Sequence, residues 1–548
     1  MERRLSTWGW GYDDRFPDRD TRATLASQVG MLTGFEGLEP REPVPIEEAS
    51  IAPSRIEPPA ALAAIATRDA RERATRAHGR AYRDIVRGFA GDYASAPDLV
   101  LRPRTEKDIE VALEWASEHG YAVVPYGGGT SVVSGVELED RDAWPGVVCL
   151  DVRRMDRVLE IDALSRAARI QAGATGPRLE EQLREHGLTL RFYPQSFELS
   201  TLGGWIATRA GGHFATLCTH IDDLVESARM LTPRGAFETR RVPASGAGPS
   251  PDRLVLGSEG ALGVITEAWV RVRPRPVHRA SASVRFAEWS DAVAATRAVA
   301  QSGLHPSNCR LLDKREALVN GVAMDGSHVL LLGFESAEHP VEPWMARALE
   351  ITADHGGRCE DGARYETETA AGAREGRDAA SDRWRRAFLD APYLVNSMVS
   401  LGVIADTFET ACTWDRLSDL HRAVVDDVRA AMKRIAGKGM ITCRFTHVYP
   451  DGAAPYFTFL APAKRGSELS QWAEIKAAAS EAIAKHGGTI THHHAVGRMH
   501  APWYEKERPA LFGEVLAAAK RALDPSGVLN PGVLVRAPRA APAPRAAD

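Results

Sequence analysis

The sequence has few cysteines, and no two of them are close together. A zinc ribbon, an iron–sulfur cluster and a redox dithiol each need closely spaced thiolates, so their absence argues against all three. We expect the cysteines to be small buried hydrophobic residues. The six positions are Cys149, Cys218, Cys309, Cys359, Cys412 and Cys443.

Long apolar runs and an excess of positive charge are also missing. No stretch approaches the roughly 18 uncharged apolar residues of a membrane-spanning helix, and the N-terminus has no apolar signal-peptide core. The 68 Lys and Arg residues against 73 Asp and Glu residues give a net charge of −5, which argues against nucleic-acid binding. With 548 residues, the chain has room for two or three domains. A multi-domain cytoplasmic enzyme is therefore expected.

Two units of mixed secondary structure are predicted by the apolar pattern. In the first, over 98–274, short apolar runs alternate with helical ones. Residues 105–108 have the spacing of a capping box, which predicts a helix to about Glu118. The second unit starts near Ala280, and its segments 442–447 and 456–459 are candidates for neighbouring strands.

The two ends of the chain differ in composition from these units. Residues 1–60 are rich in proline, charge and turn formers and predict an extended arm, although the aromatic cluster at 8–12 is too dense for a free tail. Alanine and leucine spaced by three and four predict a helix from about 55 to 87. The Ala-, Pro- and Arg-rich tail after about Val535 predicts disorder.

The sharpest motif is a glycine-rich loop directly after an apolar strand. Three successive glycines let backbone N–H groups turn inward toward an anion, and two hydroxyl residues add donors. The loop is neither a Walker A motif nor a G-x-G-x-x-G fingerprint. It suits a pyrophosphate, with a plain glycine turn as the alternative. Its residues are Pro125, Tyr126, Gly127, Gly128, Gly129, Thr130 and Ser131.

Two more segments rich in glycine and hydroxyl residues follow, and each adjoins an apolar run. One such segment is usually a turn, but three together favour a dinucleotide ligand. Their candidate binding residues are Gln195, Ser196, Ser200, Thr201, Gly204, Thr208, Arg209, Ala210 and Gly211 in one, and Glu259, Gly260, Gly263, Val264 and Ile265 in the other.

A run of three histidines, His492, His493 and His494, leaves metal-binding, catalytic and structural roles open. On an extended segment, successive side chains point to opposite faces, so only His492 and His494 are expected to share one face. Two imidazoles are too few for a zinc site unless a carboxylate or a distant histidine such as His447 joins them.

Taken in order, these motifs resemble the alkylglycerone phosphate synthase (alkyldihydroxyacetonephosphate synthase) family of flavoproteins, within the vanillyl-alcohol-oxidase and p-cresol-methylhydroxylase superfamily. The resemblance covers nearly the whole chain. Besides the glycine loops and the triple histidine, it rests on the segments 10–12, 76–79, 310–313, 408–410, 413–416, 443–444, 456–457 and 524–531.

The resemblance implies an α+β fold, with a two-part FAD-binding domain of the p-cresol-methylhydroxylase type and an α+β cap domain that places the substrate. It also implies that the three glycine loops hold FAD. The first loop has no histidine to tether the flavin, so non-covalent FAD is expected. The expected segments are an N-terminal arm and helical segment (1–95), the FAD-binding domain (96–275), the cap (276–490), a C-terminal segment returning to the flavin (491–535) and a disordered tail (536–548).

The implied reaction exchanges the acyl chain of an acyl-dihydroxyacetone phosphate for a fatty alcohol through a flavin N5 adduct. Tyr456 matches the proton-transfer tyrosine. A phenol is a poor base at pH 7, so a cation such as Arg444 or Arg310 is expected to ease its ionisation. Arg444 and the triple histidine would hold the polar end of the substrate, without a metal ion.

One departure from the family pattern keeps a second function open. Val395 and Asn396 stand where the family has an Arg-Asp pair, and this arginine contacts the substrate. Oxidation of a hydroxy acid or alcohol by hydride transfer to the flavin is therefore the alternative. Four other arginines are candidates to supply the missing charge: Arg191, Arg310, Arg385 and Arg386.

The function of a metal-dependent dehydrogenase of the same superfamily is also disfavoured. Tyr456 and His493 replace a histidine and a glutamate of the metal-site motifs of those enzymes. The expected partners are a small-molecule or lipid-like substrate and a second copy of the chain. At most peripheral membrane contact is expected, in a bacterial cytoplasm.

Overall fold

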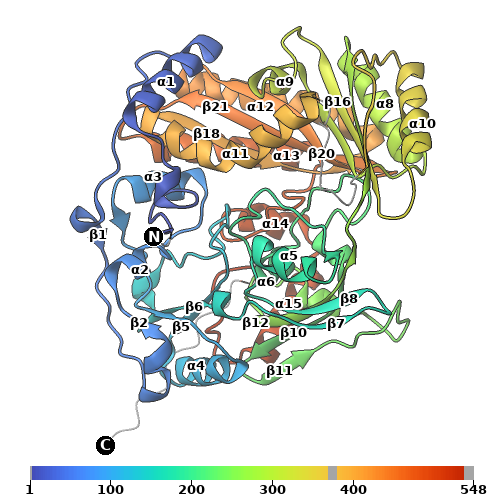
Figure 1. Cartoon of the computed structure of the whole chain (residues 1–548). Helices are drawn as coiled ribbons and strands as arrows, with labels where there is room; N and C mark the ends of the chain where they lie inside the picture. The colour runs from blue at the N-terminus through green and yellow to red at the C-terminus, as the bar shows by residue number, and fades with distance from the viewer. Residues whose placement is uncertain (1–2, 368–378, 536–548) are drawn as a thin grey trace, which may run out of the picture.

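The computed structural model describes residues 3–367 and 379–535. One large sheet with its helices forms an upper unit, two smaller sheets form a lower unit, and the N-terminal arm runs along one side of both (Figure 1). The arrangement is the α+β fold expected from the sequence. The predicted disordered tail, 536–548, lies outside the described residues.

The first part of the lower unit is a small sheet with a parallel centre. Its elements are β2 (Ala66–Thr67), β4 (Leu99–Leu101), α4 (Glu106–His119), β5 (Ala122–Tyr126) and β6 (Val147–Asp151). Within the described residues the strand order is β2-β4-β6-β5, with β4 and β5 parallel to β6. Thr105 and Asp108 each accept a hydrogen bond from the other's backbone amide, so the predicted capping box is confirmed.

An antiparallel sheet forms the second part of the lower unit. Its strands are β7 (Val158–Asp162), β8 (Ala167–Gln171), β10 (Val225–Thr232), β11 (Gly235–Glu238) and β12 (Val264–Arg271). Five helices belong to this part: α5 (Gly176–Arg184), α6 (Leu202–Thr208), α7 (Asp252–Val255), α14 (Ala501–Glu507) and α15 (Ala510–Leu523). Leu516 of α15 is buried in the same apolar cluster as Ile170 and Ala268 of the sheet. The C-terminal segment thus returns to the lower unit.

The upper unit, called the cap below, contains an antiparallel sheet. Its strands are β14 (His278–Phe286), β15 (Asn308–Leu312), β16 (His328–Ser336), β17 (Arg364–Thr367), β18 (Val403–Glu409), β19 (Cys412–Thr413), β20 (Met440–Val448) and β21 (Gly452–Pro462). Its helices are α8 (Trp289–Gln301), α9 (Lys314–Val319), α10 (Glu342–Asp354), α11 (Ala379–Leu401), α12 (Trp414–Ala436) and α13 (Glu468–His486). The predicted pairing of 442–447 with 456–459 is confirmed by β20 and β21.

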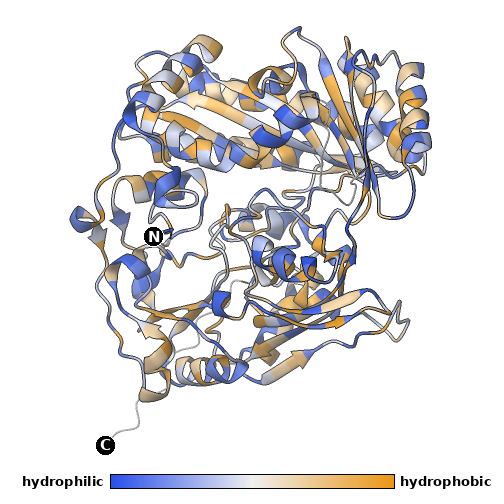
Figure 2. Ribbon diagram, in the orientation of Figure 1, coloured by the Kyte–Doolittle hydropathy of each residue, from blue (hydrophilic) through white to orange (hydrophobic). Residues whose placement is uncertain are grey.

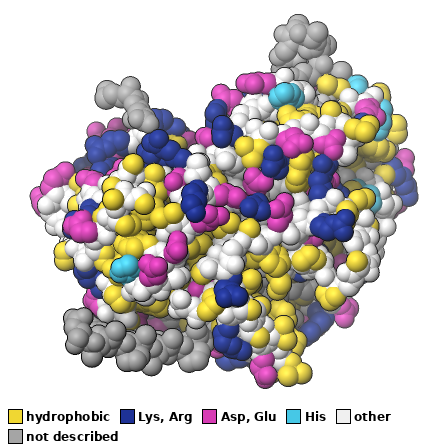
Figure 3. Space-filling model, turned by 90° about the horizontal axis from the view of Figure 1, so that it is seen from below, with side chains coloured by type: hydrophobic (Ala, Val, Ile, Leu, Met, Phe, Trp, Pro, Cys, Tyr) yellow, Lys and Arg dark blue, Asp and Glu magenta, His cyan; other side chains and the backbone are white. Residues whose placement is uncertain are grey.

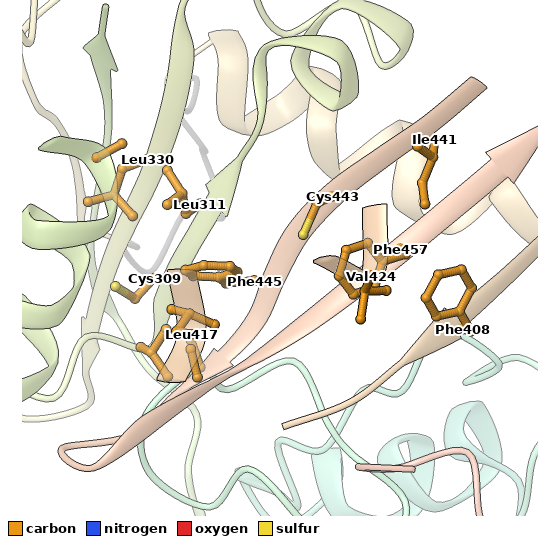
Figure 4. Close-up of a cluster of buried hydrophobic side chains, with 14 of the residues drawn as sticks. Cys309, Leu311, Leu330, Phe408, Leu417, Val424, Ile441, Cys443, Phe445 and Phe457 are labelled. Carbon is orange, nitrogen blue, oxygen red and sulfur yellow. The ribbon is translucent and has the colours of Figure 1, made fainter. Parts of the chain in front are cut away.

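Apolar side chains cover one face of the cap sheet and hold the helices to it. Phe408, Cys443 and Phe457 come from three strands and pack with Val424 of α12 (Figure 4). The strands are largely hydrophobic, whereas the outer helices carry mixed colours (Figure 2). Burial of each large apolar side chain stabilises the fold by about 1.5–3 kcal/mol. Because side chains alternate along a strand, the residues between these face the lower unit.

Two expectations for the N-terminal arm are wrong. The arm is not wholly extended, because α1 (Arg19–Thr33) packs beside α11 of the cap. The helix predicted over 55–87 is broken into a 3-10 helix (Ala60–Ile65), β2, α2 (Ala70–Ala74) and α3 (Tyr82–Phe89). Its alanine and leucine spacing was outweighed by the pairing of β2 with β4 and by Gly79, whose position has no room for a side chain.

The aromatic cluster at 8–12 is a docking segment on α11. The Trp10 N–H donates to Asn396 Oδ1 (2.9 Å), and Asn396 Nδ2 donates to the Trp10 carbonyl (3.1 Å). A Cβ on Gly9 would lie 2.9 Å from the Asn396 amide, and Gly11, with φ +78°, lies against the ring of Tyr393. Asn396, at the position that departs from the family pattern, therefore holds the arm.

Two short strand pairs complete the described strands: β1 (Ser50–Ile51) with β3 (Asp92–Tyr93), and β9 (Leu188–Thr189) with β13 (Arg273–Pro274). Within 3–367 and 379–535, no helix is both long and apolar enough to cross a bilayer. Seen from below, the surface intersperses positive and negative side chains without a large patch of one sign (Figure 3), as the small net charge of −5 would suggest.

Candidate active site

A cavity of about 550 Å³ lies between the lower unit and the cap. Most of the residues predicted to bind a cofactor line it, together with most of the predicted catalytic residues. They are Pro125, Tyr126, Gly127, Gly128, Gly129, Thr130, Ser131, Gln195, Ser196, Ser200, Thr201, Gly204, Thr208, Ala210, Gly211, Glu259, Gly260, Gly263, Val264, Ile265, Arg310, Arg444, Tyr456, His493 and His494. Arg209 and His492 are the two predicted residues outside the lining.

The first glycine loop leaves β5 and packs tightly against the second. A Cβ on Gly127 would overlap the Thr201 hydroxyl, and one on Gly128 would overlap the Leu199 carbonyl. Gly129 has φ +67°, which favours glycine. Among the described residues, none accepts a hydrogen bond from the backbone amides of these three glycines. Free amides in a cradle without side chains fit the pyrophosphate of a dinucleotide.

The third loop is tied to the C-terminal segment through Glu259. Its carboxylate accepts hydrogen bonds from the amides of Val496 (2.9 Å) and Gly497 (2.7 Å). Burial raises the pKa of Glu259 to about 7, against the opposing effect of these bonds. Arg209, by contrast, turns out of the cavity, where its Nε donates to Asp222 Oδ2 (2.7 Å).

Tyr456 lies under a guanidinium group in the cap. The Cζ of Arg444 is 3.9 Å from the centre of the Tyr456 ring, and Arg444 Nη1 is paired with Glu316 Oε1 at 2.6 Å. The Tyr456 hydroxyl donates to Thr407 Oγ1 (2.9 Å). Burial raises the pKa of Tyr456 although Arg444 acts to lower it. Arg444 is thus the neighbouring cation that the sequence analysis expected, and it eases ionisation of this phenol, but desolvation has the larger effect on the pKa.

Arg310 is a buried cation that faces the same cavity. It is 7% exposed, and its Nη2 donates to the His213 carbonyl (3.2 Å). Within the described part of the chain it has no carboxylate partner, and its Nε makes no hydrogen bond. Burial and the nearby Arg444 lower the pKa of Arg310 to about 10. A buried guanidinium with free donors suits a phosphate or carboxylate group.

The triple histidine wraps around the carboxylate of Glu409. The amide of His492 donates to Glu409 Oε2 (2.6 Å), and the amides of His493 (3.1 Å) and His494 (3.0 Å) donate to Oε1. Burial would raise the pKa of Glu409, but the adjacent histidines and the Thr491 hydroxyl hold it well below its ordinary value. This carboxylate fixes the backbone that carries the three imidazoles.

Because this segment is not an extended strand, the expectation that His492 and His494 share a face is wrong. His493 and His494 face the cavity beside Tyr456, with ring centres 5.9 Å and 5.4 Å from it. His492 points away, and its Nε2 lies 2.7 Å from the Tyr449 hydroxyl. Burial lowers the pKa of His493 to about 3 and that of His494 to about 4, so both rings are neutral at pH 7.

The cavity-facing side of the cap sheet changes from polar to apolar, row by row. Strand pairing places Glu409, Tyr456 and Arg444 in one row, Thr407, Thr458 and Thr442 in the next, and Ala405, Leu460 and Met440 in the third. Successive rows are about 7 Å apart along the strands. The apolar third row continues into α1 and α11 through Leu25, Val29, Leu32, Leu394, Val395 and Met398.

The sequence analysis did not include several residues that hold the site together. Glu409 was noticed only as part of a family motif, and Glu316, Thr407 and Tyr449 carried no local signal of their own. Of the arginines considered as replacements for the missing charge, only Arg310 lines the cavity. The other three do not; Arg191, for example, pairs with Glu335.

Comparison with known proteins shows which families the chain matches. The family "FAD binding domain" matches residues 97–240, and "FAD linked oxidases, C-terminal domain" matches residues 275–534. The alkyldihydroxyacetonephosphate synthase of Caenorhabditis elegans is 31% identical over 490 residues, which cover 85% of this chain and 81% of the relative.

Two solved structures share the fold. An alkyldihydroxyacetonephosphate synthase superposes with a TM-score of 0.78 at 24% identity, covering 96% of this chain and 98% of that one. A p-cresol methylhydroxylase with bound substrate superposes with a TM-score of 0.64 at 15% identity, covering 86% of this chain and 94% of that one. The two-part FAD-binding domain and its cap are thus confirmed. The chain is an FAD-dependent enzyme and belongs to the alkyldihydroxyacetonephosphate synthase family.

Proposed function

We propose that this enzyme exchanges the acyl chain of an acyl-dihydroxyacetone phosphate for a fatty alcohol and so forms an ether. The single observation that carries the proposal is one continuous cavity with three successive environments. A glycine cradle for FAD lies at one end, Arg310, Arg444 and Tyr456 lie in the middle, and an apolar wall lies beyond Leu460. A substrate with a phosphate group and a long hydrocarbon chain matches the second and third environments.

In this proposal Arg310 binds the phosphate through the guanidinium donors that have no partner among the described residues. Arg444 is held in place by its ion pair with Glu316, and its guanidinium lies over the ring of Tyr456. Charge-assisted hydrogen bonds of this kind contribute about 1.5–3 kcal/mol each. The substrate head is thereby placed next to Tyr456, while both alkyl chains occupy the apolar end in turn.

Bound FAD would supply the redox-active ring against which the substrate carbon is activated. Tyr456 accepts the proton from that carbon, and the guanidinium of Arg444 stabilises the phenolate that the transfer requires. The neutral imidazoles of His493 and His494 hold the polar oxygens of the substrate. The apolar wall and the buried position of Tyr456, 5% exposed, keep water from competing with the alcohol.

The test is the conversion of an acyl-dihydroxyacetone phosphate and an isotope-labelled fatty alcohol by the FAD-loaded enzyme, followed by mass spectrometry. We expect one ether product for each fatty acid released. Tyr456→Phe should retain FAD and lose the ether product. Normal ether formation by Tyr456→Phe would remove this residue from the reaction.

A different result would favour the oxidative alternative. If no ether forms, but a hydroxy acid or alcohol bleaches the flavin anaerobically and oxygen or a dye restores its colour, the enzyme is an oxidase or dehydrogenase. Val395 on the cavity wall would then mark a changed specificity, because an apolar side chain cannot replace the family's arginine charge.

Further aspects of the proposal rest on the family resemblance and on composition. We propose a role in ether-lipid biosynthesis, a homodimer, at most peripheral contact with membranes and a bacterial cytoplasmic location. The segment boundaries at 95, 275, 490 and 535 belong to the same proposal. Size-exclusion chromatography with light scattering tests the dimer directly.

A further inference from the structure

Behind the cavity wall, histidines from two distant parts of the chain come together. Three ring nitrogens, one from each of His447, His492 and His493, lie within 4.8 Å of one another. His447 is on β20, whereas the other two follow α13 and are held by Glu409. The sequence argument against a metal ion was that two imidazoles are too few unless a third joins them, and the fold brings in His447.

The positions of the nitrogen atoms suit a metal ion. His492 Nδ1 and His493 Nδ1 are 3.0 Å apart. Zinc–nitrogen bonds of about 2.0–2.1 Å in a tetrahedral site place ligand nitrogens about 3.3 Å apart. The ligand nitrogen of His447 lies within 4.8 Å of those of the other two histidines.

The other ring nitrogens have the partners that orient metal-bound histidines. His447 Nε2 lies 3.0 Å from the Gly212 carbonyl, and His492 Nε2 lies 2.7 Å from the Tyr449 hydroxyl. A carbonyl or hydroxyl partner fixes the ring and leaves the opposite nitrogen free to bind a metal ion. His492 Nε2 also lies 3.2 Å from His220 Nε2, so His492 would coordinate through Nδ1. His447 Nδ1 lies 3.1 Å from Thr446 Oγ1, a contact that coordination through this atom would replace.

Charge and ligand type narrow the choice of metal. The carboxylate of Glu409, 3.5 Å from His493 Nδ1, adds a negative charge close by. Sets of imidazoles favour zinc, cobalt, nickel and copper over magnesium and calcium.

We propose that His447, His492 and His493 bind one divalent transition-metal ion, zinc in the first instance. Two of the three ligands, His447 and His493, also line the cavity. The fourth coordination position would face it and be open to a water molecule or a substrate oxygen, as in catalytic zinc sites. This site shares His493 with the reaction proposed above, but its test measures metal binding and not ether formation.

The experiment is a metal titration of FAD-loaded protein prepared without a polyhistidine tag and dialysed against a chelator. Calorimetry with Zn²⁺ alone should give one equivalent bound per chain. His447→Gln and His492→Gln should each weaken binding by at least about 100-fold. His500→Gln is the matched control, because His500 is buried in the same segment and its Nδ1 contacts the Ala495 carbonyl; its affinity should be unchanged.

A second measurement needs no variant. Wild-type protein loaded with Co²⁺ should show the ligand-field absorption of a four-coordinate nitrogen site, which Zn²⁺ abolishes by displacement. The proposal is overturned by an absence of saturable Zn²⁺ binding, by binding that neither glutamine variant weakens, or by a Co²⁺ spectrum typical of six oxygen ligands. FAD content and melting temperature, measured without metal, show whether each variant is folded.

Discussion

Replacing Glu409 by glutamine should loosen the segment that carries the three histidines. Oε1 accepts hydrogen bonds from the Thr491 hydroxyl and from the amides of His493 and His494, and Oε2 accepts one from His492. Glutamine has a single acceptor oxygen, so its NH₂ group would face the N–H of His492. The loss of one charged acceptor and the weakening of the others should cost about 2–4 kcal/mol.

Two assays separate the local effect from the global one. Denaturant unfolding of the FAD-loaded protein measures the change in free energy, and hydrogen exchange measures protection of the amides at 492–494. Glu507→Gln is the control, because this exposed carboxylate bonds the Thr489 hydroxyl and the Ile490 amide just ahead of the histidines; it should cost about 1 kcal/mol or less. Unchanged protection and stability in Glu409→Gln would refute the reasoning.

Three further predictions follow from the cavity. Arg310→Gln should raise KM for a phosphate-bearing substrate by about 10–100-fold, since one charge-assisted contact is worth about 1.5–3 kcal/mol; Arg310→Lys should restore part of it, and an unchanged KM would place the phosphate elsewhere. Leu460→Arg should reduce turnover of long-chain substrates by about 100-fold while FAD stays bound, because it buries a charge in the apolar wall. Leu460→Met is the control. Normal turnover by the arginine variant would mean that the hydrocarbon chain of the substrate does not lie against this wall. Since burial raises the pKa of Glu259 from about 4.5 to about 7, the folded apoprotein binds a proton more tightly than the unfolded chain, and its stability should fall as pH rises through that interval. Unfolding curves at several pH values should show a smaller fall for Glu259→Gln, and identical slopes would contradict the assignment.

Local signals in the sequence predicted the elements whose contacts are local. Thr105 and Asp108 form the expected capping box, and the strands around Arg444 and Tyr456 pair as neighbours. The glycines at 127–129 could be identified because a loop without side chains is visible in the sequence itself. Each of these features depends on residues close together in the chain or on a short hairpin.

Features that depend on distant contacts could not be obtained in this way. Nothing near Glu409 indicates that its carboxylate will collect amides more than 80 positions later in the chain. The direction of each histidine follows from that contact and not from strand alternation. The raised pKa of Tyr456 depends on how completely the lower unit and the cap exclude water, and no sequence pattern reports this.

The contact between the aromatic cluster and α11 brings parts of the N-terminal arm into the wall of the cavity. Trp10 lines the cavity, and Leu25, Val29 and Leu32 of α1 form its apolar end. A shortened protein that begins at residue 97, where the first family region begins, would keep the glycine loops and Tyr456 but lose one wall of the cavity. Deletion of the arm should therefore change which lengths of hydrocarbon chain the enzyme accepts in its substrate. A bulky fusion packed against Trp10 should have the same effect.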